Sequence, residues 1–248
     1  MNKLAKFLDS TFLDLGREFK WTYLPPLMVY MAAGISGLTG IVGTFFVKDY
    51  LNLSAAFLAG LGFWAGIPWA LKMPLGHLVD LIWSRKNYLV FVGAGLIVLS
   101  VIIMYGLIIH TETMASILKV ETWFIVSALL APVGYVTQDV VADAMTVEAI
   151  PSTDDQGIQY STQQIKIMHT TMQTLGRFAI IGGFFLVALV NVVMFAGVSA
   201  LSEAEKIEIY GRIYLYALII PIVSVSGVFL ANYLKRQRMD KLKKSGMS

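Results

Sequence analysis

Residues 88–109 read YLVFVGAGLIVLSVIIMYGLII, an apolar run without a single charged side chain. At 1.5 Å per residue, a helix of this length rises about 33 Å, enough to cross the ~30 Å hydrocarbon core of a bilayer. The run is apolar on every side, whereas a strand of a membrane barrel alternates polar and apolar residues over about ten positions. The run therefore predicts a transmembrane α-helix.

Five further apolar stretches accompany this run. We place the six predicted spans at 24–47, 55–75, 88–109, 122–145, 178–197 and 213–234. Of the 248 residues, 57% are hydrophobic and 14% are charged, against about 25% charged in ordinary soluble domains. The predicted fold class is all-α: a polytopic membrane protein whose six-helix transmembrane domain occupies 24–234.

The basic residues predict the orientation. Thirteen Lys and Arg residues fall on one set of connecting segments and four on the other. Because cytoplasmic segments carry the basic excess, we expect both termini in the cytoplasm and a multi-pass protein of the plasma (inner) membrane. Residues 1–23 mix charges with apolar residues at helical spacing, which predicts an interfacial amphipathic segment rather than a cleaved signal peptide. Residues 235–248 form a basic cytoplasmic tail.

Several kinds of chemistry are absent or disfavoured. The chain has no cysteine, which excludes disulfides, thiolate metal sites and cysteine nucleophiles. No two of the three histidines share a short helical spacing, so we expect no metal site, and no cofactor is predicted. The net charge of +3 is dispersed between apolar runs, so the expected partner is the lipid bilayer and not a nucleic acid.

Ionisable residues at membrane depth are costly, so they mark functional sites. In the second span, Pro68 and Pro74 each remove a backbone donor and predict a bend. Lys72 lies between them. Its amine either extends to the cytoplasmic interface or faces a central cavity, where it pairs with a carboxylate or binds an anionic solute.

The fourth span carries two acids four residues apart, Asp139 and Asp143, which share one helix face. Two carboxylates in an apolar helix need cationic partners to stay ionised. Lys72, Arg85 and Lys86 enter from the same side, so we expect a buried ion-pair network near the cytoplasmic gate. Asp139 is then a candidate protonatable coupling site, and a purely structural salt bridge is the alternative.

The candidate residues fall into two groups. Lys72, Gln138, Asp139 and Arg177 are assigned to the path of substrate or ion, and Arg177 either reaches the cavity or extends to the interface. The predicted gate network consists of Gly76, Asp80, Arg85, Lys86, Asp143 and Glu148. Close helix packing is expected at glycines that recur every third residue of the first span, namely Gly34, Gly37, Gly40 and Gly43.

Two features carry a family resemblance. Gly76 and Asp80, followed by the pair Arg85-Lys86, resemble the signature loop of major facilitator transporters, although Trp83 and Ser84 stand where a second glycine is usual. Residues 46–54 and 67–76, with the run 139–144 and Glu148, resemble the folate–biopterin transporter family. The start Gln138-Asp139 also looks like the related muropeptide permeases and acetyl-CoA transporters.

The resemblance covers roughly 46–148 and implies a fold of two six-helix halves that rock around a central site. It implies that Lys72 and Asp139 lie near the cavity, and that Asp80, Arg85 and Asp143 belong to the gate. Six spans and a basic tail then correspond to an N-terminal half. Either the sequence is a truncated or split polypeptide, or a second copy or a separate chain supplies the second half.

The leading functional prediction is a secondary active transporter, or half of one, for a small organic solute, with a folate- or pterin-like anion as candidate and protons as the expected coupling ion. The alternative is a non-transporting membrane scaffold or an accessory subunit of a larger complex. An enzyme is not expected, because no metalloprotease, serine–histidine or phosphate-loop pattern is present. A channel would require a polar pore stripe, which is also not evident.

Overall fold

The computed structural model describes residue 16 and residues 19–46, 53–154 and 157–244, and these are almost entirely helical. Among them, six helical stretches are long and apolar enough to cross a membrane: Trp21–Thr44, Ala55–Leu81, Asn87–Ile109, Val120–Ala149, Thr162–Ala200 and Glu203–Asp240. The predicted class, an all-α polytopic membrane protein, is confirmed. The expected amphipathic helix lies mostly in residues 1–15, outside the described part.

The first two spans are interrupted. A 3₁₀ turn, η2 (Trp21–Tyr23), leads into α3 (Leu24–Ile35), and a second one, η3 (Ser36–Thr39), separates α3 from α4 (Gly40–Phe46). The second span consists of α5 (Ala55–Ala70) and α6 (Lys72–Leu81), joined at Leu71. This confirms the predicted bend, because Pro68 and Pro74 on either side cannot donate their backbone hydrogen bonds. The bend makes Lys72 the first residue of α6.

The remaining helices are longer. After the turn η5 (Trp83–Arg85), they are α7 (Asn87–Ile109), the short α8 (Thr111–Ile117), α9 (Val120–Ala149) and α10 (Thr162–Met194), then η6 (Val198–Ala200), α11 (Glu203–Ala217) and α12 (Ile219–Lys244).

Two of these helices extend beyond the predicted spans. Helix α10 begins well before 178, at a capping box in which Ser161 and Gln164 exchange hydrogen bonds. Helix α12 continues past the predicted end of the span at Leu234, since residues 235–244 contain neither glycine nor proline.

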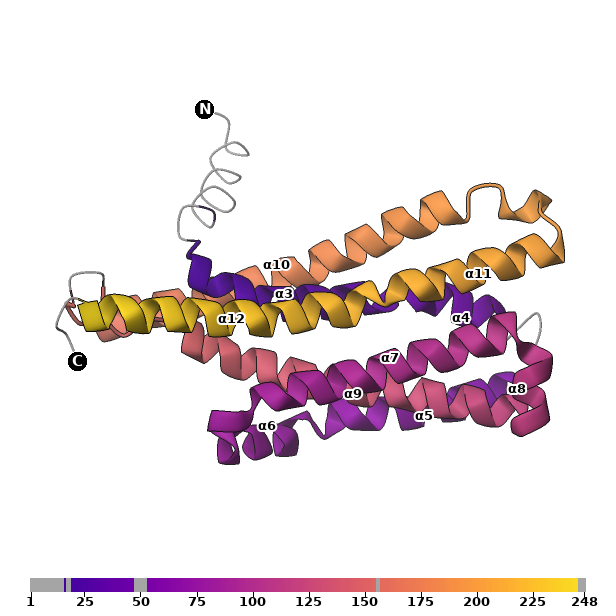
Figure 1. Ribbon diagram of the computed structural model, residues 1–248, viewed down its shortest axis with the longest axis horizontal. Helices are drawn as coiled ribbons and strands as arrows, with labels where there is room; N and C mark the ends of the chain where they lie inside the picture. Colours follow the sequence, from indigo (N-terminus) through magenta and orange to yellow (C-terminus); the bar gives the residue numbers. More distant parts are fainter. Residues whose placement is uncertain (1–15, 17–18, 47–52, 155–156, 245–248) are drawn as a thin grey trace.

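The helices form two groups that lie side by side (Figure 1). Helix α3 packs against α10 and α12. Helix α7 packs against α9, and α5 and α6 also pack against α9. Helices α11 and α12 join the groups through their contacts with α7. The beginnings of α3 and α10, the turn η5 and the end of α12 lie at the same end of the bundle, which we call the basic end.

Glycines set the closest helix crossings. A Cβ on Gly93 of α7 would lie 2.6 Å from the carbonyl oxygen of Gly134 on α9, and a Cβ on Gly183 of α10 would lie 2.8 Å from the Cα of Gly34 on α3. Beside the first crossing, Ser100 and Ser127 join their hydroxyls at 2.9 Å. Small residues therefore bring both helix pairs into backbone contact, as expected for membrane helices.

Burial is uneven across the bundle. Helix α7 buries ten residues, and α5 buries none. Side chains such as Phe63 and Trp64 on α5 and Phe185 on α10 are more than half exposed. In a membrane protein, such apolar surface is covered by lipid or by another protein.

One buried polar side chain gives a stability prediction. Asn191 of α10 is 5% exposed, and neither of its amide atoms has a hydrogen-bond partner within the described ranges. An unsatisfied buried polar group costs about 1–3 kcal/mol. Asn191→Leu is therefore expected to raise the free energy of unfolding by about 1 kcal/mol in a detergent or nanodisc unfolding assay. Gln173→Leu, at an exposed position of α10, is the matched control. If Asn191→Leu lowers the free energy of unfolding and Gln173→Leu does not, the amide of Asn191 has a hydrogen-bond partner.

Candidate functional site

Two carboxylates on α9 and one lysine on α6 form an ion cluster. The Nζ of Lys72 lies 2.5 Å from Oδ2 of Asp139 and 3.0 Å from Oδ2 of Asp143. The side chain of Asp139 is 8% exposed, whereas those of Lys72 and Asp143 are 37% and 45% exposed. The cluster thus has a buried side at Asp139 and an accessible side at Asp143. The expected pairing between the fourth span and a cation from the second is present.

A tyrosine from the first span completes this cluster. The hydroxyl of Tyr30 on α3 donates a hydrogen bond to Oδ1 of Asp143 at 2.5 Å. Its ring packs on α10 where a Cβ on Gly176 would lie 2.9 Å from the ring, so glycine at that position makes room for it. We call Tyr30, Lys72, Asp139 and Asp143 the Lys72 cluster. Sequence reasoning missed Tyr30, because a single tyrosine in an apolar helix carries no distinguishing signal.

Formal charges in the Lys72 cluster do not cancel. One ammonium faces two carboxylates, so the cluster carries a net charge of −1 when all three groups are ionised. Arg177, next to Gly176 on α10, is exposed and has no ion pair in the described part of the chain. Its neighbour Gly176 contacts the ring of Tyr30, which places Arg177 close to the cluster. Arg177 is therefore a cation beside the cluster but outside its contacts.

Gln138 has a different place. Its side-chain amide donates to the carbonyl oxygen of Val90 on α7 at 3.0 Å and to the hydroxyl of Ser224 on α12 at 2.9 Å. The side chain is buried, and these contacts tie α9 to two neighbouring helices. Gln138 was assigned together with Asp139 to the translocation path. Its hydrogen bonds serve helix packing instead and do not support that assignment.

A second ion pair closes the basic end. The ammonium of Lys86, 3% exposed, lies 2.7 Å from Oε1 of Glu148 and 4.0 Å from the centre of the Trp83 ring. It also donates to the carbonyl oxygen of Trp83 at 3.3 Å. Trp83, which stands where the resemblance expects a glycine, therefore forms one wall of the Lys86 site. The contacts join the turn before α7 to the end of α9.

The predicted gate network is consequently divided. Asp143 belongs to the Lys72 cluster, and Lys86 with Glu148 forms the separate pair. Asp80 and Arg85 are exposed and form no ion pair among the residues that the structure describes. A Cβ on Gly76 would meet nothing within 4 Å, so no helix packs closely there. The turn directs its second basic residue, rather than its first, into the bundle.

The Lys86 pair gives a second stability prediction. Glu148→Gln is expected to lower the free energy of unfolding by about 1–2 kcal/mol, because it leaves the buried ammonium without its carboxylate. The loss stays below that of a fully buried pair, since Glu148 is 38% exposed. Arg85→Gln, one residue before Lys86, is the control and should change unfolding by less than about 0.5 kcal/mol. Equal effects of the two substitutions in an unfolding titration would contradict this assignment.

The fold and the Lys72 cluster together define a polytopic α-helical membrane protein with ionisable side chains inside its bundle. Its sequence is similar to the folate-biopterin transporter of Synechocystis sp., with 30% identity over 149 residues. The match covers 58% of this chain and 28% of that protein, so it spans less than a third of the relative's length. No family model matches the chain, and no solved structure matches it.

Proposed function

We propose that this chain is a secondary active transporter, or half of one, for a small organic solute. The observation that carries the proposal is the Lys72 cluster: a lysine and two aspartates from different spans meet inside the bundle, with Asp143 accessible. Charged groups at this depth are costly to maintain in a protein that only fills a membrane. The name of the Synechocystis relative supports the same function.

A folate- or pterin-like anion is the proposed solute. The relative's printed name supplies this substrate class, and the exposed guanidinium of Arg177 next to the cluster suits an anionic group on the solute. The accessible carboxylate of Asp143 can accept hydrogen bonds from amino and ring N–H groups of such a solute. The two features together suit a molecule with a planar donor-rich part and an anionic part.

Protons are the proposed coupling ion. Because the cluster has one carboxylate more than it has cations, it can take up a proton without losing the ion pair between Lys72 and the other carboxylate. Asp139 is the proposed proton site. Because its side chain is 8% exposed, its negative charge depends on Lys72 rather than on water for stabilisation. Uptake of one proton would neutralise the cluster, and its release would restore the charge of −1.

A second six-helix unit is proposed to complete the transporter, from another copy of the chain or from a different polypeptide segment. The support is that Lys72 and Asp143 are partly exposed, while α5 on the same side of α9 buries no residue. Alternating access would then arise from rocking of the two units, with both termini of this chain in the cytoplasm. The native mass in lipid nanodiscs, corrected for lipid, distinguishes a dimer from a monomer that needs another partner.

The direct test is uptake of radiolabelled folate and pterin into proteoliposomes, with and without an imposed pH gradient. The expected result is accumulation that depends on the gradient and that unlabelled solute abolishes. If the chain is folded and dimeric yet shows neither uptake nor binding of any solute in the panel, it acts as a non-transporting scaffold or accessory subunit. Binding without dependence on the pH gradient would reject proton coupling alone.

A further inference from the structure

The end of α12 concentrates positive charge outside the apolar part of the helix. Residues 235–244 read KRQRMDKLKK and contain six basic residues and one acidic residue, for a net charge of +5. The whole chain carries +3, so the rest of the protein is net negative. The basicity of this segment is therefore a local feature and does not reflect the composition of the chain. Helix α12 continues through it to Lys244.

The described basic side chains of this segment are free of carboxylate partners. Lys235, Arg236 and Arg238 are exposed, and none of them forms an ion pair within the described ranges. Elsewhere in the described part, Lys72, Lys86, Lys206 and Arg212 pair with acidic side chains, whereas Arg85 and Arg177 are single unpaired cations. Three unpaired cations within one helical turn repel each other, and an anion that binds them relieves that repulsion.

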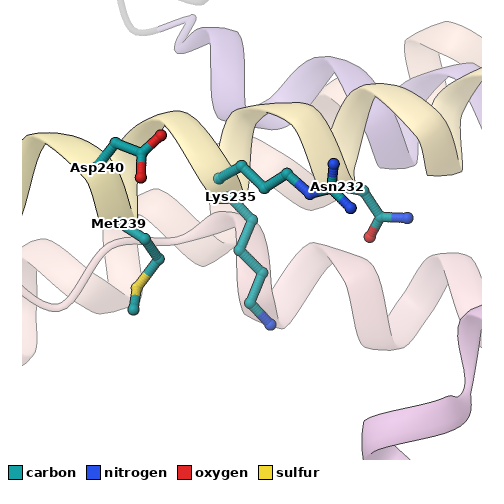
Figure 2. A pocket seen from close by; sticks show the side chains of 5 residues that line it. Asn232, Lys235, Met239 and Asp240 are labelled. Carbon is teal, nitrogen blue, oxygen red and sulfur yellow. The ribbon is translucent and has the colours of Figure 1, made fainter.

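An open hollow lies along this part of α12, lined by Asn232, Lys235, Arg236, Met239 and Asp240. In Figure 2 the side chains of Asn232, Lys235 and Met239 extend to the same side of the helix, and the carboxylate of Asp240 lies toward the opposite edge. The hollow thus offers an amide, an ammonium and a guanidinium as donors. These are the groups that bind phosphate oxygens.

The preceding turns of α12 set the depth of this hollow. Tyr233 is 57% exposed, and exposed tyrosines near the end of a span favour the level of the lipid headgroups. Lys235 and Arg236 follow Tyr233 by less than one turn, about 3–5 Å along the axis. Met239 adds an exposed apolar side chain. We therefore expect these donors at the level of the bilayer phosphates.

We propose that the basic extension of α12 binds the phosphate of an anionic phospholipid headgroup through Lys235 and Arg236, which line the hollow, while Arg238 adds positive charge on the same turn. This binding is separate from solute transport and requires only that the chain is inserted in a membrane. Each basic residue near an anionic surface strengthens binding about fivefold, so neutralising three of them is expected to weaken it about a hundredfold. Basic residues next to a span also favour the cytoplasmic side of the membrane. That preference does not require a lipid that stays bound after extraction.

The experiment uses the full chain, extracted in detergent from vesicles of equal phosphatidylglycerol and phosphatidylcholine, with retained lipid counted by native mass spectrometry. The wild-type chain is expected to retain phosphatidylglycerol in preference to phosphatidylcholine. The triple variant K235Q/R236Q/R238Q is expected to lose this preference. The charge-conserving variant K235R/R236K/R238K is expected to keep it.

A matched variant at the other end of the bundle, K119Q/K206Q/R212Q, removes the same charge and is expected to retain the lipid as the wild type does. Loss of lipid in this control, or full retention in K235Q/R236Q/R238Q, would overturn the proposal. An excess of inorganic phosphate distinguishes the source of the phosphate. Complete displacement of the lipid by inorganic phosphate would assign the hollow to a soluble anion and overturn the lipid assignment. These readouts are independent of whether the chain transports any solute.

Discussion

Lys72→Ala is expected to abolish solute uptake in proteoliposomes and also to destabilise the bundle. The ammonium of Lys72 contacts both Asp139 and Asp143. Without it, Asp139 remains 8% exposed with its charge uncompensated, and removal of one partner from a buried ion pair costs about 3–5 kcal/mol. Because Lys72 itself is 37% exposed, we expect the lower end of this range in an unfolding titration.

Asp139→Asn is expected to abolish solute uptake while the bundle stays almost as stable as the wild type. The substitution leaves Lys72 paired with Asp143, and Tyr30 still donates to Asp143, so the loss of stability should stay below about 1 kcal/mol. Uptake should nevertheless fall to background, because the proposed proton site is gone. Lys166→Ala, at an exposed position of α10, is the control and should transport normally. Uptake within about twofold of the wild type in both Lys72→Ala and Asp139→Asn would reject the role of the Lys72 cluster in transport.

The second large effect is expected at the crossing of α3 and α10. A Cβ on Gly34 would collide with the carbonyl oxygen of Ile180 and lie 3.0 Å from the Cα of Gly183. Both obstacles are backbone atoms and cannot move aside as a flexible side chain can. Gly34→Ala must therefore separate the two helices, and we expect a loss of about 3 kcal/mol in the free energy of unfolding.

Gly40→Ala is the matched control for this crossing. Gly40 lies in the same glycine series, yet a Cβ there would meet nothing within 4 Å, and its φ of −63° suits alanine. The free energy of unfolding of the variant should equal or slightly exceed that of the wild type, because alanine is the better helix former. If Gly34→Ala and Gly40→Ala have equal stabilities in nanodiscs, the crossing is not as close as the structure describes.

Local pattern was sufficient for the helices and for several of the candidate side chains. Continuous apolar runs predicted the spans, because length and hydropathy are properties of each segment alone. The proline pair predicted a bend in the second span for the same reason, and the structure places it at Leu71. The spacing of four residues between Asp139 and Asp143 predicted their common face. The stretch 158–177 could extend the fifth helix on the cytoplasmic side, and α10 does begin before 178, at Thr162 rather than at 158.

The ion pairs between different helices could not be predicted from local pattern. Lys72, Arg85 and Lys86 were all candidate cations for the two aspartates, and spacing in the chain does not distinguish them. The structure selects Lys72, because the bend at Leu71 and the packing of α6 on α9 bring its amine to the carboxylates. Lys86 binds Glu148 instead. The four glycines of the first span were equivalent as a pattern, and only the packing of α10 against α3 separates Gly34 from Gly40.

By itself, then, the sequence determined that this is a polytopic helical membrane protein with charged side chains at membrane depth, since the hydrophobic effect acts on each apolar segment whatever its neighbours. The tertiary structure decided which charges meet, which glycine lies at a helix crossing, and that Tyr30 joins the Lys72 cluster. These contacts join residues on different helices, and their geometry depends on helix packing that no single segment encodes.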